Sequence, residues 1–404
     1  MKLVCMIDNL GSGGAQRQLT SLAVLLKQGG HSVSFVTYHP DDFFLPVLQN
    51  AGIAVTCLKN LRRFQRPLAL RRTLRSCSPD AVLAFLEGPS LYCELAGLPS
   101  RQWGLVVSER LQVSAQRLFP DLKRWAHSLA DYITTNSHAN RCELVRLLPS
   151  LAGRVATIYN CLDLDFFSPG RPEPRNSGIR FLTAASYQPR KNPLGLIQAF
   201  SLVRQRAPDF QFRLDWYGGF PTAAGGLPDR RHFEQARQAI RQHGLERHFY
   251  LHETTAKLRE AYRTADVVVL PSFAEGLPNV LCEGMACGLP VLSSKIGDAE
   301  ILVSEGRNGY LFDPRSPDDI ARAILRLGML SPSDRAQMGD CSRKFAQTLF
   351  APSTAVRAYT ALLEAAATRR SIPMPHSPPD GAGSRGLAAN LTAAISKSES
   401  HAHS

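Results

Sequence analysis

The chain has 404 residues, of which 44% are hydrophobic and 20% charged, and it carries a formal net charge of +13. This length predicts two domains, and the composition is that of an ordinary globular protein. Nine cysteines without a C-x-x-C pair argue against a disulfide framework and a zinc site, and no apolar run reaches the length of a membrane span.

The chain begins with a predicted strand over residues 2–7, too short an apolar run for a secretory signal, so we expect a cytoplasmic protein. A glycine-rich turn (NLGSGG, residues 9–14) and a helix over residues 15–28 follow. Gly13 and Gly14 would let the backbone approach a ligand closely or adopt a positive φ. The glycine spacing matches neither the dinucleotide fingerprint nor the P-loop, and a tight turn is the alternative.

Residues 59–79 hold a dense group of basic side chains and no acidic one. The group runs from Lys59 to Arg75, with leucines and Phe64 interleaved. One interpretation is docking on an anionic membrane surface, which would place the protein at the inner face of the cell membrane. The other is a solvated helix face. We expect no nucleic acid as partner, because no binding motif accompanies the charge.

Further short strands, at residues 31–37, 53–57, 81–86, 104–107, 132–135 and 155–158, alternate with helical stretches. This alternation predicts an α/β domain with a doubly wound parallel sheet over residues 1–168. Residues 169–178 (PGRPEPRNSG) have the composition of a linker.

The same alternation returns over residues 179–349, which we predict to be a second Rossmann-like domain. A helix over residues 350–368 follows, expected to pack back across the domains. From residue 369 to 404 the chain is rich in Ser, Pro, Ala, Gly and His, and this composition predicts a disordered tail.

The stretch 271–297 places Glu275 on a loop and Glu283 eight residues later, one turn into a predicted helix over residues 279–287. Such a loop lies at the carboxyl edge of the sheet, where α/β proteins bind ligands. The N–H groups around Leu277, Asn279 and Val280 would face an anion. Glu283 would accept hydrogen bonds from the two hydroxyls of a ribose. The alternative is a capping residue and a solvated face.

Two cations, Arg190 and Lys191, follow the strand predicted at residues 179–184, on the same sheet edge. Together with Glu275 and Glu283, these cations are better explained as a site for a nucleoside diphosphate than as a structural ion pair. Alone, they would indicate a solvated charged turn.

Four motifs in order resemble glycosyltransferase family four, which has the GT-B fold of two facing Rossmann-like domains. They are NLGSGGAQRQL, IYNCLDLDFFSP (158–169), PSFAEGLPNVLCEGMACGLPVL and GRNGYLFDP (306–314), and the resemblance covers residues 1–367. It implies transfer of a sugar from a nucleoside-diphosphate donor to a saccharide or lipid-linked acceptor, with retention at the anomeric carbon. The implied setting is cell-surface polysaccharide or glycolipid assembly.

The resemblance also implies roles for individual residues. Glu275 would contact the transferred sugar and Lys191 the diphosphate, and these are the catalytic candidates; Glu283 would bind the ribose. The donor cradle would be completed by Gly13, Gly14, Arg190, Gly276, Leu277, Asn279 and Val280. One departure is Ser186, at a position where the family often has an arginine. No metal or cofactor is implied.

The acceptor side is less marked in the sequence. Its candidates are Glu109, Arg110 and His127, although a histidine on such a helix is more often a packing residue than a base. Two other functions stay open. A sugar-nucleotide epimerase of the same fold would need no acceptor. A non-catalytic nucleotide-sugar-binding protein would bind the nucleotide sugar without converting it.

Overall fold

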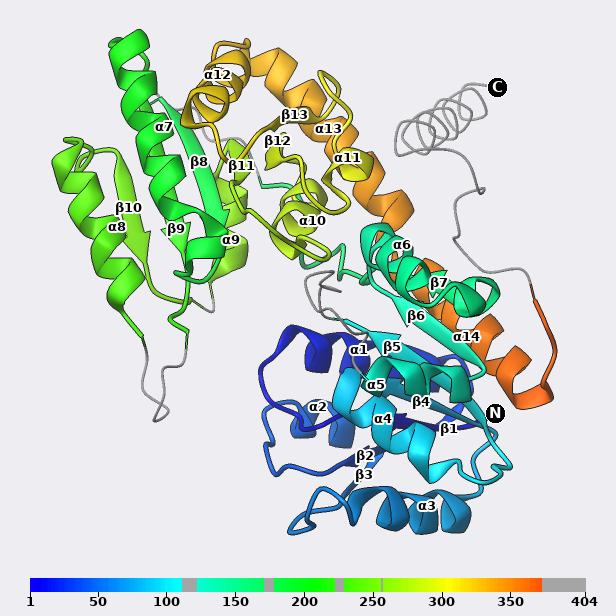
Figure 1. The fold of residues 1–404 in the computed structure, drawn as a ribbon. Helices are drawn as coiled ribbons and strands as arrows, with labels where there is room; N and C mark the ends of the chain where they lie inside the picture. Colours follow the sequence, from blue (N-terminus) through cyan, green and yellow to red (C-terminus); the bar gives the residue numbers. More distant parts are fainter. Residues whose placement is uncertain (111–121, 171–177, 222–228, 256, 373–404) are drawn as a thin grey trace, which may run out of the picture. The chain divides into compact units, whose positions relative to one another are not determined.

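The computed structural model describes residues 1–110, 122–170, 178–221, 229–255 and 257–372 (Figure 1). They form two compact units. The N-terminal unit holds Met1–Cys161 and the described residues from Pro352 onward, and the C-terminal unit holds Leu162–Ala351. Most of the predicted linker (171–177) and of the predicted tail (373–404) lies outside the described residues.

The division between the units falls at Cys161, earlier than the domain end predicted at residue 168. Local hydrogen bonds account for it. The Cys161 carbonyl accepts from Gln18 Nε2 in the N-terminal unit at 2.9 Å. The next N–H, that of Leu162, donates to the Phe350 carbonyl in the C-terminal unit at 2.9 Å.

The N-terminal unit is built on a seven-stranded parallel sheet in the order β3-β2-β1-β4-β5-β6-β7. Leu3 of β1 lies opposite both Val33 and Ala81, so the chain reverses its direction of winding between β1 and β4. Ligands bind at such a switch point in open α/β sheets. The strands are β1 Lys2–Met6, β2 Ser32–Thr37, β3 Ala54–Cys57, β4 Ala81–Phe85, β5 Gly104–Glu109, β6 Tyr132–Thr135 and β7 Val155–Thr157.

Helices cover both faces of this sheet, because successive strand side chains point to opposite sides. Leu3 and Cys5 pack with α1 and α14, whereas Val4 and Met6 pack with α3, α4 and α6. The helices are α1 Gly14–Gln28, α2 Leu45–Asn50, α3 Arg66–Cys77, α4 Glu87–Ala96, α5 Leu122–Trp125, η1 Ala126–Leu129, α6 His138–Leu147, η2 Pro149–Arg154 and α14 Pro352–Thr368.

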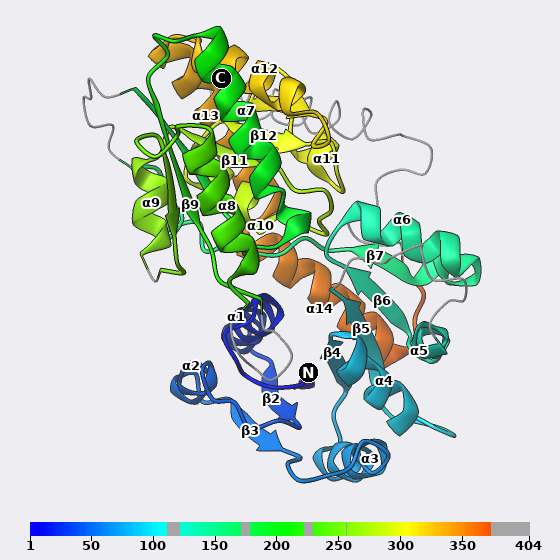
Figure 2. The ribbon, with the colours of Figure 1, turned by 60° about the vertical axis from the view of Figure 1, so that its left-hand side comes forward.

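The helix predicted at 350–368 is α14, which runs along β4 and β5 of the N-terminal unit (Figure 2). Its buried residues Tyr359, Leu362 and Ala366 recur at helical spacing and form one apolar face. The helix approaches the sheet so closely that a Cβ on Gly104 would lie 2.4 Å from the Ala366 carbonyl carbon. The closing segment of the described chain is therefore part of the first core.

The C-terminal unit has a six-stranded parallel sheet in the order β10-β9-β8-β11-β12-β13. Phe181 of β8 lies opposite Leu214 and Val267, so this sheet has its own switch point between β8 and β11. The continuous apolar run of β11 is buried on both faces, as expected for a central parallel strand. The strands are β8 Ile179–Ala184, β9 Phe212–Tyr217, β10 Phe249–His252, β11 Val267–Leu270, β12 Val291–Ser294 and β13 Gly309–Phe312.

One face of this sheet packs against α7, α8 and α12 (Figure 1), and the other face contacts α9 and α10. The contact of α10 with the sheet is tight, because a Cβ on Gly284 would lie 2.5 Å from Val268 Cγ2. The helices are η3 Pro189–Lys191, α7 Pro193–Arg206, α8 Arg231–Gln242, α9 Leu258–Thr264, α10 Asn279–Ala286, α11 Ala299–Leu302, α12 Pro317–Gly328 and α13 Pro332–Leu349. In the described part of the chain, no helix combines the length and apolar character needed to cross a membrane.

Candidate active site

The switch point between β8 and β11 brings together charges that are far apart in sequence. The chain leaves β8 through η3, which carries Arg190 and Lys191, and leaves β11 through the loop that carries Glu275. Lys191 Nζ lies 2.5 Å from Glu275 Oε1, and Arg190 Nη1 lies 3.7 Å from Glu275 Oε2. The predicted cluster on one sheet edge is therefore present for these three residues.

The two loops that carry this cluster are cross-linked by hydrogen bonds. The Phe273 N–H donates to the Arg190 carbonyl at 2.8 Å, and Arg190 Nη1 donates to the Ala274 carbonyl at 3.3 Å. Asn192, in the left-handed region at φ 56°, donates from Nδ2 to the carbonyls of Pro271 at 3.1 Å and Pro314 at 2.8 Å. These bonds fix the separation of Lys191 and Glu275.

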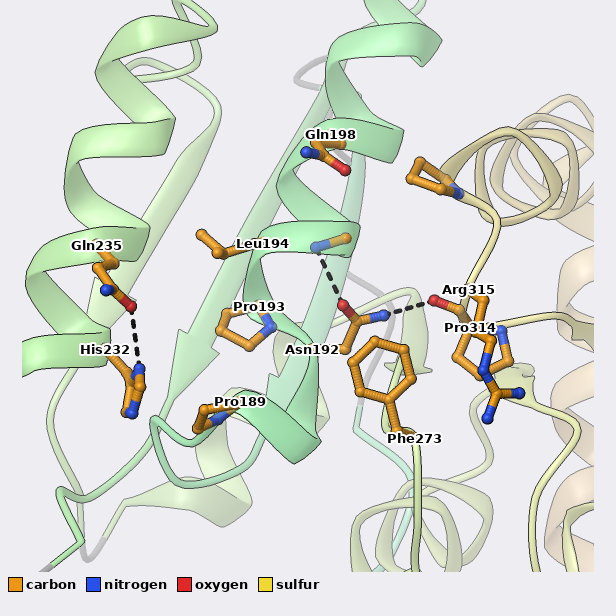
Figure 3. A pocket seen from close by; sticks show the side chains of 12 residues that line it. Pro189, Asn192, Pro193, Leu194, Gln198, His232, Gln235, Phe273, Pro314 and Arg315 are labelled. Atoms are coloured by element: carbon orange, nitrogen blue, oxygen red, sulfur yellow. Dashed lines mark hydrogen bonds between the residues drawn. The ribbon is translucent and has the colours of Figure 1, made fainter.

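Asn192 also caps α7, because its Oδ1 accepts from the Gly195 N–H at 3.1 Å (Figure 3). A cavity of about 470 Å³ lies beside it, with Pro189 and Phe273 in its lining. The Phe273 ring is 40% exposed, so packing of this ring does little to hold the loop. The hydrogen bonds of Asn192 and of the backbone hold it instead.

The Glu275 carboxylate receives a second hydrogen bond from a fully buried hydroxyl, since Ser272 Oγ donates to Glu275 Oε1 at 2.7 Å. Burial lowers the pKa of Lys191, and the charge of Glu275 opposes this shift. The ammonium thus depends on a nearby anion for its stability. Such a cation is suited to exchange one anionic partner for another.

The second carboxylate, Glu283, lies one turn into α10 and is 5% exposed. Its Oε2 accepts a hydrogen bond from the Tyr262 hydroxyl at 3.0 Å. The helix begins at Asn279 with no acidic residue in its first turn. Its dipole therefore leaves partial positive charge around Asn279 and Val280, next to the loop of Gly276 and Leu277.

Support for this loop comes from a turn that the sequence analysis did not single out. Gly297 has φ 51°, and a Cβ on it would lie 2.9 Å from the Glu275 carbonyl and 3.0 Å from that of Gly276. Only glycine combines this φ with such a close approach. A glycine between two elements was the only signal in the sequence.

In the N-terminal unit, Gly13 is the N-cap of α1 and Gly14 is its first residue. The alternative that these glycines adopt a positive φ is wrong, since neither belongs to the positive-φ glycines of the described chain. A Cβ on Gly13 would instead lie 2.2 Å from Gln16 Oε1, so the glycine leaves room for that side chain. Gln16 Nε2 in turn donates to Asp8 Oδ1 at 3.0 Å.

Two of the acceptor-side candidates, Glu109 and His127, meet in a buried cluster. His127 Nδ1 lies 2.7 Å from Glu94 Oε1, and its Nε2 lies 3.4 Å from Glu109 Oε2. Burial lowers the pKa of His127, but hydrogen bonds and charge from Glu109 and Glu94 raise it on balance to about 9. The cluster is an imidazolium between two carboxylates, and these three side chains are at most 2% exposed.

Arg110 lies elsewhere in the same unit. Its guanidinium stacks over the Phe85 ring at 3.9 Å and donates to Asn160 Oδ1 at 2.5 Å and to the Tyr359 hydroxyl at 2.7 Å. The structure therefore brings Glu109 and His127 together but separates Arg110 from them. An acceptor role for the three residues stays a prediction.

The switch point of the first sheet contains a residue that no pattern indicated. Leu86, directly after β4, has φ 77° and ψ 154°. This region of backbone space is almost confined to glycine, and strain of this kind concentrates at functional positions. A leucine gives no sequence signal for it.

The basic segment has a partly structural role. Arg66 lies over the Tyr38 ring at 4.3 Å, and Arg71 donates to the Ala96 carbonyl at 2.6 Å. In the same segment, Phe64 is 73% exposed and Leu68 is 55% exposed. Membrane docking stays a prediction.

In the part of the chain that the structure describes, no group of three or more His, Cys, Asp or Glu residues could hold a metal ion. Metal-independent transfer also stays a prediction.

Two models of known protein families match this chain. A model described as Glycosyltransferase Family 4 matches residues 12–166, and one described as Glycosyl transferases group 1 matches residues 178–328. The chain belongs to the family-four glycosyltransferases. In this glycosyltransferase, Glu275 and Glu283 lie inside the second match.

Curated relatives of this glycosyltransferase include a D-inositol 3-phosphate glycosyltransferase 2 from Catenulispora acidiphila. It is 29% identical over 218 residues, which cover 52% of this chain and 51% of the relative. A D-inositol 3-phosphate glycosyltransferase from Geodermatophilus obscurus is 30% identical over 257 residues, covering 60% and 56%. The chain spans about half the length of the curated relatives it matches.

Solved structures confirm the GT-B fold. Anabaena Alr3699/HepE in complex with UDP superimposes with a TM-score of 0.77 at 19% identity, over 90% of this chain and 100% of the other. A glycosyltransferase from Rickettsia africae gives a TM-score of 0.78 at 14% identity, over 90% and 98%. The family-four glycosyltransferase therefore has the two Rossmann-like sheets expected from its sequence.

Proposed function

We propose that this glycosyltransferase moves a sugar from a nucleoside-diphosphate donor to an acceptor hydroxyl, with retention at the anomeric carbon. The observation that carries the proposal is the contact of Lys191 with Glu275 at the switch point of the second sheet. Glu283, one turn into the adjacent α10, adds a carboxylate for the ribose. The structures of Alr3699/HepE with UDP and UDP-glucose support a nucleotide-sugar donor.

The charges suggest how the donor would be held. Lys191 and the more exposed Arg190 would turn from Glu275 to the diphosphate, while the dipole of α10 would favour the same anion. Glu275 would then accept hydrogen bonds from the sugar hydroxyls. The bond from the anomeric carbon to the phosphate oxygen breaks, a bond to the acceptor oxygen forms, and the proton of the acceptor hydroxyl passes to the leaving diphosphate. Stabilising the negative charge of the leaving diphosphate is the main help that this site would give.

Ser186, where the family often has an arginine, leaves the diphosphate with one fewer cation. Arg190 would compensate from further along the same loop. Its side chain is 51% exposed, and its Nη1 lies 3.7 Å from Glu275 Oε2, so it has room to move toward a ligand. We expect Arg190→Ala to weaken nucleotide binding less than Lys191→Ala does, because the Lys191 side chain is only 13% exposed.

The acceptor that we favour is a saccharide or lipid-linked hydroxyl in cell-surface polysaccharide or glycolipid assembly, at the inner face of the cell membrane. Two exposed apolar side chains, Phe64 just before the basic α3 and Leu68 within it, support a membrane contact. Flotation with phosphatidylglycerol vesicles would test it, comparing wild type with an Arg63→Ser, Phe64→Ser variant. Binding that is absent, or unchanged in the variant, would overturn the membrane contact.

The curated relatives' names offer a different acceptor, an inositol 3-phosphate. One assay separates the outcomes: UDP-, GDP- and ADP-sugars are incubated with a membrane lipid extract, with inositol 3-phosphate, or with no acceptor. Product formation with retained anomeric configuration, read by NMR, supports the proposal. A changed donor sugar without acceptor would indicate an epimerase, and nucleotide binding without turnover a non-catalytic protein.

A further inference from the structure

A fully buried tyrosine stands behind the carboxylate that faces the ribose in the proposed site. Tyr262 belongs to α9, and its exposed fraction is 0%. Its hydroxyl lies 3.0 Å from Glu283 Oε2 and 3.4 Å from the Val280 carbonyl of the same helix, α10. The tyrosine precedes the motif that begins at Pro271 and belongs to no predicted site.

The hydroxyl is placed to donate to Glu283. A phenol has one proton, and the closer, ionised acceptor forms the stronger hydrogen bond. Burial raises the pKa of Tyr262 well above its ordinary value, so the phenol keeps its proton at working pH. The phenol is therefore available as a donor to Glu283.

The ring that carries this hydroxyl is fixed. Phe167 meets it edge-to-face, with ring centroids 6.0 Å apart and planes at 80°. The helix α10 that carries Glu283 packs closely on the sheet, because a Cβ on Gly284 would lie 2.5 Å from Val268 Cγ2. The hydroxyl and the carboxylate are thus held at a set separation by packing on both sides.

We propose that Tyr262 is a positioning residue that makes the donor site selective for ribonucleotides over 2′-deoxyribonucleotides. It holds one oxygen of Glu283 so that the carboxylate plane stays turned to both ribose hydroxyls. The inference rests on the proposed function, since it needs a nucleotide at Glu283. If the carboxylate could rotate, it would bind a sugar with one hydroxyl nearly as well as a ribose with two. The preference for ribonucleotides over 2′-deoxyribonucleotides would then weaken.

The test compares dissociation constants by calorimetry for UDP, GDP and ADP and for their 2′-deoxy counterparts. The proteins are wild type, Tyr262→Phe, Glu283→Gln and the double variant. Loss of a hydrogen bond to a charged group changes affinity by about tenfold or more, so wild type is expected to prefer its ribonucleotide by at least about tenfold. In Tyr262→Phe the preference is expected to fall to about twofold or threefold, and the double variant should match Glu283→Gln.

Tyr187→Phe is the matched control, because Tyr187 is also fully buried in the C-terminal unit. Its hydroxyl bonds only backbone carbonyls in the described structure, those of Trp216 at 3.0 Å and His252 at 2.8 Å. This variant should lose stability and keep the ribose preference. An unchanged preference in Tyr262→Phe, or an equal loss in Tyr187→Phe, overturns the inference. No nucleotide binding by wild type overturns the proposed function itself.

Discussion

Lys191 and Glu275, separated by 84 residues in sequence, form a contact of 2.5 Å in the C-terminal unit. Both side chains are largely shielded, at 13% and 10% exposure. A shielded pair costs desolvation energy that the contact only partly offsets, so such pairs are poor devices for stability alone. We therefore infer that the pair provides a cation and a carboxylate for the proposed nucleotide-sugar donor.

Replacing Glu275 by glutamine should separate binding from chemistry. The amide keeps the size of the side chain but removes the charge that holds Lys191. We expect the affinity for the nucleoside diphosphate to stay the same or to rise, because Lys191 no longer has to leave a carboxylate. Transfer should fall on the order of a hundredfold or more. Calorimetry with the nucleotide and initial rates with the donor sugar would check this, and an equal loss in both would contradict it.

Replacing His127 by glutamine should destabilise the N-terminal unit and remove a dependence on pH. The folded pKa of about 9 lies above the usual value of 6.5, so the contribution of the imidazolium is complete below about pH 6.5 and disappears as pH rises through 9. Breaking a buried ion pair costs roughly 3 kcal/mol or more. Urea unfolding should be measured for wild type and variant at pH 6.5 and pH 9.5. The difference in their free energies of unfolding should be large at the lower pH and small at the higher pH. A difference that is constant with pH would contradict this account.

Replacing Gly284 by alanine should push α10 away from the sheet. The new methyl would lie 2.5 Å from Val268 Cγ2, and both partners are fixed in the core. Overpacking of this kind costs about 1 to 3 kcal/mol. Donor affinity should also fall, because Glu283 is the neighbouring residue. Gly306→Ala is a useful control: nothing lies near its Cβ, so it tests a substitution with backbone strain alone, at φ 75°.

Replacing Arg343 by methionine should destabilise the C-terminal unit while leaving the N-terminal unit unchanged. The guanidinium donates to the carbonyls of Phe167 at 2.7 Å, Ala286 at 2.5 Å and Leu164 at 3.0 Å. It thus ties the start of the unit to the end of α10. Leaving these carbonyls without a donor should cost about 2 to 4 kcal/mol. Hydrogen exchange of α10 should speed up, whereas that of β1 should not.

Much of the fold was predictable because parallel sheets use short, buried, apolar strands with a clear pattern. The run Val267–Leu270, which ends before Pro271, is short and wholly apolar, as is typical of a buried parallel strand. Topology then brought Lys191 and Glu275 to one edge, since the carboxyl ends of neighbouring parallel strands coincide.

The supporting residues could not be predicted, because their roles depend on partners distant in sequence. Tyr262 and Asn192 resemble ordinary helix and loop residues until α10 and the loop at Pro314 are placed beside them. Glu109 and Arg110 were predicted as members of one acceptor site, and the structure separates them for a simpler reason. Consecutive residues at the end of a strand point to opposite sides, and these two enter separate clusters.

The most direct measurement is a thermal-shift titration of wild type and Lys191→Gln with UDP, GDP and ADP. A nucleotide at a hundred times its dissociation constant stabilises the folded state by about 2.7 kcal/mol, a readily measured increase in melting temperature. We predict that one of the three nucleotides gives this increase with wild type and that Lys191→Gln loses most of it. If none stabilises wild type, or if the variant responds as wild type does, the switch point at Lys191 and Glu275 is not a nucleotide site.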